Sequence, residues 1–272
     1  MSEKTRADLA LFRQGLCESR ERAQAAIMEG RVFFGDRRIN KPSETIPEDA
    51  RLILKAPEID YVSRGALKLE KAIRVFHADL ENRVVMDIGA STGGFTDICL
   101  RSGARKVYAI DVGYGQLDWK LRNDPRVVVM ERTNARLLDP DLFPETPSVA
   151  VMDVSFISIR LILPSAIRIM GEKGIFYTLI KPQFEAGREH VGKNGVVREP
   201  EIHMSVIRNI VSFAEEIGWR VTDLDYSPVT GPKGNIEFLA VIRKAGPEEP
   251  VLSEDRIRNI VQEAHDHLKL SS

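Results

Sequence analysis

The feature that most constrains this fold is the segment 84–97, which reads VVMDIGASTGGFTD. A short run of apolar, mostly β-branched residues contains the acid Asp87, and glycines and small residues then lead into an apolar helix start. This order predicts a strand, a tight turn and a helix N-terminus. Glycine lets the backbone approach a ligand closely, and the free N–H groups of a helix start can meet its polar part. The pattern favours an α/β fold with a ligand site where the strand ends.

A second acid stands at the end of the next expected strand, about twenty residues after the glycine turn. The run 106–111, KVYAID, ends in Asp111, and an acid at the tip of the second strand typically binds ribose hydroxyls. The glycine turn has the order D-x-G-x-x-x-G-G, which departs from the dinucleotide fingerprint G-x-G-x-x-G. An acid in the turn without a phosphate cradle suits a nucleoside with an amino-acid tail, as in S-adenosylmethionine (SAM) sites. The alternative is a tight turn in another kind of α/β protein.

Strands and helices alternate along most of the chain, which predicts a doubly wound, mostly parallel Rossmann-like sheet. We expect strands at residues 84–88, 106–111, 127–131, 149–154, 175–181, 221–226 and 236–243, and helices at 63–76, 94–101, 116–122, 157–170, 200–218 and 253–268. The last two strands follow each other without a helix, so they should form an antiparallel pair. The expected domains are a small α+β unit at 1–56, a linker at 57–60, the sheet domain at 61–246 and a C-terminal helix at 247–272.

Composition narrows the classes of function. The 272 residues are 43% hydrophobic and 29% charged, as in an ordinary globular protein, and the net charge of −1 means that any contact with nucleic acid must come from a local basic patch. Cys17 and Cys99 are expected to be buried thiols, with no disulfide and no metal site. The N-terminus lacks the apolar stretch of a signal peptide, and no run of ~18 apolar residues predicts a membrane span. The sequence thus predicts a cytoplasmic protein and leaves its oligomeric state open.

The N-terminal unit reads as two helices followed by a short hairpin. Its run 15–44, GLCESRERAQAAIMEGRVFFGDRRINKPSE, resembles the small RNA-binding module named after a ribosomal small-subunit protein, the alpha-L motif. The resemblance implies that basic side chains contact RNA phosphates. The candidate RNA-binding residues are Arg6, Arg20, Arg22, Arg31 and Lys41. The alternative is a small interaction domain whose arginines are solvated.

Four charged residues lie within strongly apolar stretches. Lys68 is in the helix before the glycine turn, and the other three stand at the ends or starts of expected strands: Asp153, Lys181 and Glu237. A buried charge is costly unless it is paired, so these residues should cluster, and two lysines with two acids make a neutral set. Each also has a plain structural alternative, such as a helix cap for Asp153 or a solvated helix face for Lys68.

Residues 61–244 resemble the haemolysin-A-like (TlyA) family, which looks like FtsJ-type ribose 2′-O-methyltransferases acting on ribosomal RNA. The stretches that carry the resemblance are YVSRGALKLEKA, DIGASTGGFTD, DVSFISI, IKPQFEAGRE and GNIEFL. The resemblance implies a catalytic tetrad of Lys68, Asp153, Lys181 and Glu237. It also implies SAM as cofactor and ribosomal RNA or ribosomal subunits as partner, with cytidine as the nucleotide. The implied SAM contacts are Asp87, Gly89, Ala90, Ser91, Thr92, Gly93, Gly94, Phe95, Asp111 and Asn134.

Lys181 is the candidate base, and the sequence leaves open whether it removes the proton of the hydroxyl or only orients it. Methylation of a base leaves other marks. Attack through a cytosine carbon needs a cysteine nucleophile near the site, and amino-nitrogen methylation usually follows an N-P-P-Y-like turn, where this chain has DVSF. Within DVSF, Phe156 is expected either to stack on a base or to lie in the core.

Two loops could border the substrate. The segment 183–198 carries Arg188, His190, Lys193 and Arg198, and reads either as an RNA-facing lid or as a solvated surface loop. The segment 228–234 is expected to border the substrate groove. Two other functions remain open: a non-catalytic RNA-binding protein that keeps SAM as a ligand, and a membrane-active haemolysin, as the older family name suggests. The sequence offers no apolar span for the second.

Overall fold

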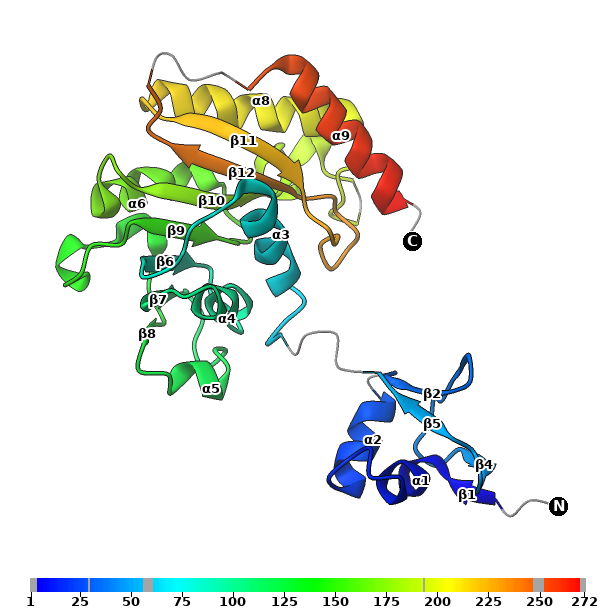
Figure 1. Ribbon diagram of the computed structural model, residues 1–272. Coiled ribbons are helices and arrows are strands. Elements are labelled where there is room, and N and C mark those ends of the chain that lie inside the picture. The colour runs from blue at the N-terminus through cyan, green and yellow to red at the C-terminus, as the bar shows by residue number, and fades with distance from the viewer. Residues whose placement is uncertain (1–3, 29, 56–60, 193, 247–251, 270–272) are drawn as a thin grey trace. The chain divides into compact units, whose positions relative to one another are not determined.

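The structure is a computed structural model that describes residues 4–28, 30–55, 61–192, 194–246 and 252–269. The chain divides into two compact units, residues 1–60 and 61–272 (Figure 1). Each unit has a hydrophobic core of its own. The two units are described separately below.

The first unit is a small α+β domain, as expected. It contains β1 (Lys4–Arg6), α1 (Ala7–Arg13), α2 (Arg20–Met28), β2 (Val32–Phe34), β3 (Arg37–Arg38), β4 (Thr45–Pro47) and β5 (Leu52–Leu54). Ser19 caps α2, because its Oγ accepts a hydrogen bond from the N–H of Arg22 at 3.2 Å. The antiparallel pair of β1 and β4 was not predicted, since strands of three residues are too short to show a hydrophobic period.

The second unit is built on a seven-stranded sheet. Its strands are β6 (Val84–Ile88), β7 (Lys106–Ile110), β8 (Val127–Met130), β9 (Val149–Met152), β10 (Ile175–Ile180), β11 (Arg220–Tyr226) and β12 (Phe238–Arg243). They lie in the order β11-β12-β10-β9-β6-β7-β8, and only β12 runs antiparallel to its neighbours. The predicted doubly wound sheet and antiparallel final pair are therefore confirmed.

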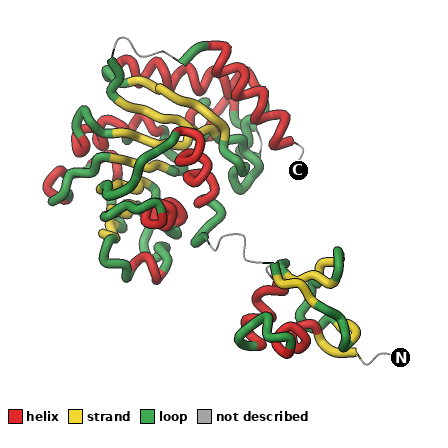
Figure 2. The backbone as a smooth tube through the Cα atoms, viewed as in Figure 1, coloured by secondary structure: helices red, strands yellow, loops and turns green. Residues whose placement is uncertain are grey.

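Helices cover both faces of this sheet (Figures 1 and 2). One face carries α3 (Ala66–Phe76), α4 (Gly94–Arg101) and α5 (Trp119–Arg122), and the other carries α6 (Leu163–Met170), α8 (Pro200–Glu216) and α9 (Glu254–Lys269). Strand β6 shows why its sequence is apolar apart from Asp87. Met86 packs into one core and Val85 into the other, so both faces of the strand are buried.

Several predicted elements have different bounds. The helix expected at 63–76 begins at Ala66, and the one expected at 157–170 is a 3₁₀ turn, Ile159–Leu161, followed by α6. Pro164 lies in the first turn of α6, where its missing N–H costs nothing and its ring favours a helix start. The loop expected at 183–198 contains the end of α7 (Pro182–Glu185) and a 3₁₀ turn, Arg188–His190; Lys193 lies outside the described residues.

Candidate active site

The site forms where the central strands end, and strand register decides which residues meet there. Ile88 of β6 pairs with Ile110 of β7 and with Met152 of β9. The residues that follow these strands, Gly89, Asp111 and Asp153, therefore reach the same edge of the sheet. On the other side of β9, Ile180 of β10 pairs with Phe238 of β12. This places Lys181, which follows β10, level with Glu237, which precedes β12.

The glycine turn after β6 depends on two of its glycines. Gly89 has φ +87°, and a Cβ there would lie 2.7 Å from the carbonyl oxygen of Asp153. Gly93 has φ +101°, and its Cβ would lie 2.2 Å from Cδ1 of Leu121. Both positions thus combine a left-handed backbone with a close neighbour, and a side chain would force the turn apart. The turn places the backbone of residues 89–91 against the end of β7.

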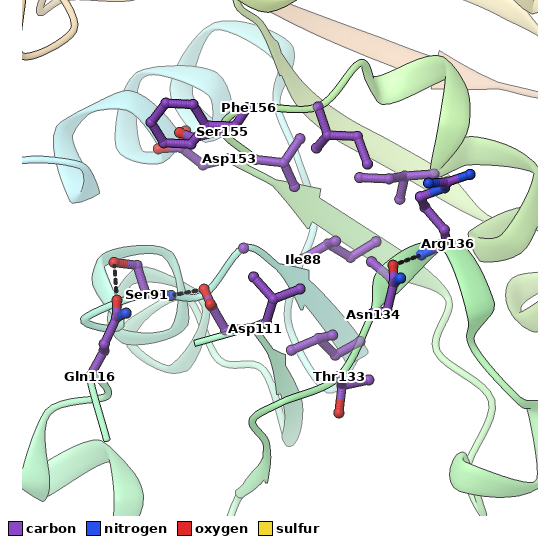
Figure 3. Close-up of a pocket in the computed structure, with 17 residues that line it drawn as sticks. Ile88, Ser91, Asp111, Gln116, Thr133, Asn134, Arg136, Asp153, Ser155 and Phe156 are labelled. Carbon is purple, nitrogen blue, oxygen red and sulfur yellow. Dashed lines mark hydrogen bonds between the residues drawn. The ribbon is translucent and has the colours of Figure 1, made fainter. Parts of the chain in front are cut away.

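A cavity of about 340 Å³ lies between this turn, the end of β8 and the segment after β9 (Figure 3). The Asp111 carboxylate enters it and accepts hydrogen bonds from the N–H groups of Ser91 and Gly113, at 2.8 and 2.7 Å. Asn134 lies across the cavity and caps the following 3₁₀ turn. Of the ten predicted SAM contacts, four line the cavity: Gly89, Ser91, Asp111 and Asn134. The rest shape the end of β6, the turn and the start of α4: Asp87, Ala90, Thr92, Gly93, Gly94 and Phe95.

Asp87 is a fully buried acid beneath the turn. Its Oδ2 accepts a hydrogen bond from the hydroxyl of Thr96 at 2.6 Å, while its Oδ1 has no hydrogen-bond partner among the described residues. Burial raises the pKa of Asp87 to about 7. A buried acceptor without a donor is unusual and indicates a missing partner. Together with the glycine turn and the Asp111 carboxylate, it fits a nucleoside that carries an amino-acid tail.

The four charged residues predicted to cluster lie in direct contact. Nζ of Lys68 is 2.7 Å from Oε2 of Glu237 and 3.3 Å from Oδ2 of Asp153, and Nζ of Lys181 is 2.5 Å from Oδ1 of Asp153. Lys68 is 8%, Lys181 7% and Glu237 1% exposed, so three members are buried. Asp153 also lines the cavity and so connects it with the two lysines.

The two lysines of the tetrad differ in the number of carboxylates that they contact. Lys68 lies between two carboxylates. Its burial favours the neutral form, but Asp153 and Glu237 outweigh this effect and raise the pKa of Lys68 above its usual value. Lys68 therefore stays charged. Lys181 contacts one carboxylate, that of Asp153, which it shares with Lys68.

Two further residues extend the tetrad and were not predicted. The ammonium of Lys181 donates to Oγ of Ser155 at 3.0 Å, and the amide of Gln183 donates to Oε1 of Glu237 at 3.2 Å. Each stands two positions after a tetrad member, in D-x-S and K-x-Q. This spacing is the only local sign in the sequence that the two residues lie near the tetrad. Their contacts with Lys181 and Glu237 depend on the turns after β9 and β10, which the spacing does not predict.

Phe156 lies on the rim of the cavity (Figure 3) and is 91% exposed, so the core interpretation is wrong. Its backbone is left-handed, with φ +64°, and its ring lies 5.1 Å from that of Phe184. Buried Glu185 fixes the segment behind it by accepting hydrogen bonds from the Ser158 hydroxyl and the Ile159 N–H, at 2.6 and 2.8 Å. An exposed aromatic ring is thus held in a costly conformation beside Asp153.

In the first unit, two candidate RNA-binding residues share one acid. Asp8 is buried and accepts hydrogen bonds from Arg6 at 3.0 and 2.9 Å and from Arg20 at 3.1 Å. The side chains of Arg6 and Arg20 are 43% and 46% exposed. Arg22 and Lys41 are exposed, and Arg31 is half-buried.

Among the residues that the structure describes, no group of three or more histidines, cysteines or acids could hold a metal ion. Across the same residues, no helix is both long enough and apolar enough to cross a lipid bilayer. Cys99 is buried as expected, whereas Cys17 is partly exposed.

The chain matches two protein families. Residues 61–244 match the FtsJ-like methyltransferase family, and residues 5–52 match the S4 domain. Together the two matches cover both compact units and contain all the site residues discussed above.

Similar proteins agree with these matches. YqxC of Bacillus subtilis is 48% identical over 98% of this chain and 96% of its own. A protein of Mycobacterium tuberculosis named 16S/23S rRNA (cytidine-2′-O)-methyltransferase TlyA is 41% identical over 89% of this chain and 91% of its own. A solved structure from Streptococcus thermophilus that carries a hemolysin name is 46% identical, with a TM-score of 0.76, and covers 100% of this chain and 99% of that one.

Proposed function

Because the chain belongs to the FtsJ-like methyltransferase family, we propose that it transfers a methyl group from SAM to a ribose 2′-hydroxyl of ribosomal RNA. The observation that carries the proposal is the ion-paired tetrad of Lys68, Asp153, Lys181 and Glu237 at the edge of the cavity, in which all members but Asp153 are buried. Burying three charges is costly, and a chain that only needed stability would gain more from apolar residues there. A buried cluster of this kind is expected where its charged groups take part in a reaction.

The cavity would hold the cofactor. We assign Asp111 to the ribose hydroxyls, because its carboxylate is fixed by two backbone N–H groups and faces the cavity. Asp87, fully buried and hydrogen-bonded to Thr96, would support the turn from beneath and place a carboxylate near the amino-acid tail. Gly89, Ser91 and Asn134 would contact the cofactor directly, and the remaining predicted contacts would act by shaping the turn. When bound, SAM supplies an electrophilic methyl group.

The tetrad would prepare the acceptor. A ribose hydroxyl is a weak nucleophile near neutral pH and needs a group that takes its proton. Lys68 is held as a cation by two carboxylates, so we assign the proton-accepting role to Lys181. Lys181 would first release one proton to solvent, and as a neutral amine it would then take the proton of the hydroxyl while the oxygen bonds to the methyl group. Asp153 and Ser155 fix the position of its Nζ, and Glu237 balances the charge of Lys68. The remaining rate enhancement would come from alignment of the two reactants.

The names of the relatives and the first unit support a proposal for the acceptor. The TlyA relative is named for cytidine 2′-O-methylation of 16S and 23S rRNA, and we propose a cytidine in one or both of these RNAs here. Phe156, exposed beside Asp153, would stack on the base of the target nucleotide. Arg6, Arg20, Arg22, Arg31 and Lys41 of the S4 domain would contact RNA phosphates. The reaction would take place in the cytoplasm, where ribosomal RNA lies.

The test is methyl transfer from labelled SAM to ribosomal subunits that lack the modification, followed by alkaline hydrolysis. A 2′-O-methyl group blocks cleavage of the next phosphodiester, so the proposal predicts label in alkali-stable dinucleotides. Label in single nucleotides would indicate a methylated base and contradict the proposal. SAM binding without any transfer would favour a non-catalytic RNA-binding protein. Lysis of lipid vesicles without SAM or RNA would favour a haemolysin.

A further inference from the structure

A second hollow adjoins the tetrad on the side of α3. We call it the basic groove: a cavity of about 520 Å³ whose cationic lining residues are Arg64, Arg198 and Lys233. It shares Arg64 and the β11–β12 loop with a smaller cavity of about 330 Å³ that is lined by Lys68. In Figure 1 this loop lies beside α3, near the end of α9. The basic groove therefore adjoins a smaller cavity that reaches Lys68 of the tetrad.

The formally charged residues that line the basic groove are all cations. No aspartate or glutamate belongs to the described residues that line either cavity. The three cationic side chains are exposed and form no hydrogen bond or ion pair with any other described residue. Elsewhere in this unit arginines commonly form ion pairs with acids, as in Arg101–Asp97 at 2.7 Å and Arg208–Glu254 at 2.8 Å. Three unpaired cations that line one hollow attract an extended anion.

The walls of the basic groove are fixed. Asn235 is 3% exposed and joins the two loops that form them. Its amide donates to the carbonyl oxygen of Gly195 at 2.9 Å, and its Oδ1 accepts from the N–H of Val197 at 3.0 Å. The hydrogen bond between the N–H of Gly231 and the carbonyl of Asn235, at 2.9 Å, closes the β11–β12 loop. Arg198 and Lys233 thus stand on loops that are tied together and need little ordering when a ligand binds.

We propose that the basic groove binds the sugar–phosphate backbone of the RNA strand next to the target nucleotide. The inference rests on the proposed function and adds the path of the substrate to it. Asp153 lines the cofactor cavity, and its ion-pair partner Lys68 lines the hollow beside the groove. A strand in the basic groove would therefore bring its ribose to the tetrad from the side that the cofactor cavity does not occupy. Phosphate contacts of this kind position a nucleic acid without reading its sequence.

The test compares full-length variants with equal changes in charge. Arg198→Gln/Lys233→Gln removes two groove cations. Arg74→Gln/Lys173→Gln removes two exposed cations that line neither cavity. Arg198→Lys/Lys233→Arg keeps the charge of the groove. For each, KM for ribosomal RNA is measured against salt, together with kcat, SAM affinity and the thermal unfolding midpoint.

The expected result is that the groove variant alone raises KM for RNA, with SAM affinity and kcat at saturating RNA unchanged. Two lost phosphate contacts make the dependence of log KM on log salt concentration less steep. Between about 50 and 200 mM salt, the factor by which KM increases should therefore be about seven times smaller for this variant than for wild type. The charge-preserving variant should behave as wild type.

Two results would overturn the inference: a salt slope equal to that of the Arg74/Lys173 variant, or a loss of kcat with an unchanged KM. Failure of the proposed function looks different, because wild type itself would then transfer no methyl group. In that case the affinity of the same variants for ribosomal RNA, measured by filter binding against salt, still decides whether the basic groove contacts phosphates.

Discussion

At the scale of the residue, Asp8 decides how two candidate RNA-binding arginines are presented. Its carboxylate is buried, and hydrogen bonds from Arg6, Gln24 and Arg20 hold its pKa well below the usual range. Asp8→Asn should weaken binding to ribosomal RNA several-fold, because both guanidinium groups lose their anchor. The loss of charge-assisted hydrogen bonds at a buried carboxylate should also lower the free energy of unfolding, by about 1–3 kcal/mol.

The matched control for Asp8 is Glu48→Gln, which removes the same charge from an exposed ion pair with Arg13. Its effect on unfolding should stay within about 1 kcal/mol, and RNA binding should not change. RNA titrations and thermal unfolding of both variants check this. Equal RNA affinity of Asp8→Asn and wild type would show that Asp8 does not position these arginines for RNA. Because the pKa of Asp8 is lowered, its stabilising effect should be lost as pH falls below about 4.

Gly89 gives a second residue-level prediction. Gly89→Ala should abolish SAM binding, because the new Cβ would lie 2.7 Å from the carbonyl oxygen of Asp153 and push the turn away from β9. Gly171→Ala is the control. It has a similar positive φ, +69°, but nothing lies within 4 Å of its Cβ, so it should cost only backbone strain of roughly 1–2 kcal/mol. SAM titration of both variants separates the two effects, and normal SAM affinity of Gly89→Ala would contradict our view of the turn.

At the scale of elements, a pair of buried histidines joins α8 to α9. Nδ1 of His203 lies 3.0 Å from Nε2 of His265, and burial, followed by the neighbouring His265, lowers the pKa of His203 to about 4. The folded protein therefore keeps His203 neutral where the unfolded chain already binds a proton. Stability should be unaffected above pH ~7 and should fall by up to roughly 3 kcal/mol as pH drops from about 6.5 to about 4.

Thermal unfolding of His203→Gln against pH checks this prediction. The variant should lose part of the acid-induced decrease in stability, whereas His190→Gln, at a half-exposed imidazole, should keep all of it. A pH profile of His203→Gln that parallels wild type would mean that other groups cause the decrease.

The elements also show what the sequence could predict. Strand β6 and helix α4 have the predicted bounds, because an apolar strand, a glycine turn and an amphipathic helix are each marked by local residues. The clustering of Lys68 with Glu237 followed from the cost of isolated buried charge. Ser155, Gln183 and the pair of β1 with β4 were missed, since their contacts depend on turns and on long-range pairing that no local pattern records.

At the scale of the whole molecule, function is divided between two units that each have a core. The chain carries a net charge of −1, so attraction to RNA depends on where cations are placed. In the first unit the exposed guanidinium groups of Arg6 and Arg20 share Asp8, and in the second the basic groove collects Arg64, Arg198 and Lys233. Neither set was visible from overall composition, because the 39 lysines and arginines and the 40 acids nearly cancel in the net charge.

In the proposed reaction Lys181, held by Asp153 beside the cavity, makes a ribose hydroxyl of ribosomal RNA reactive. The most direct measurement is single-turnover methyl transfer to unmodified ribosomal subunits by wild type and Lys181→Ala, with SAM affinity measured for both. We predict ribose-linked label with wild type, a loss of at least about 100-fold in rate for the variant, and equal SAM affinity. Full transfer by Lys181→Ala, or label on a base with wild type, would contradict the account.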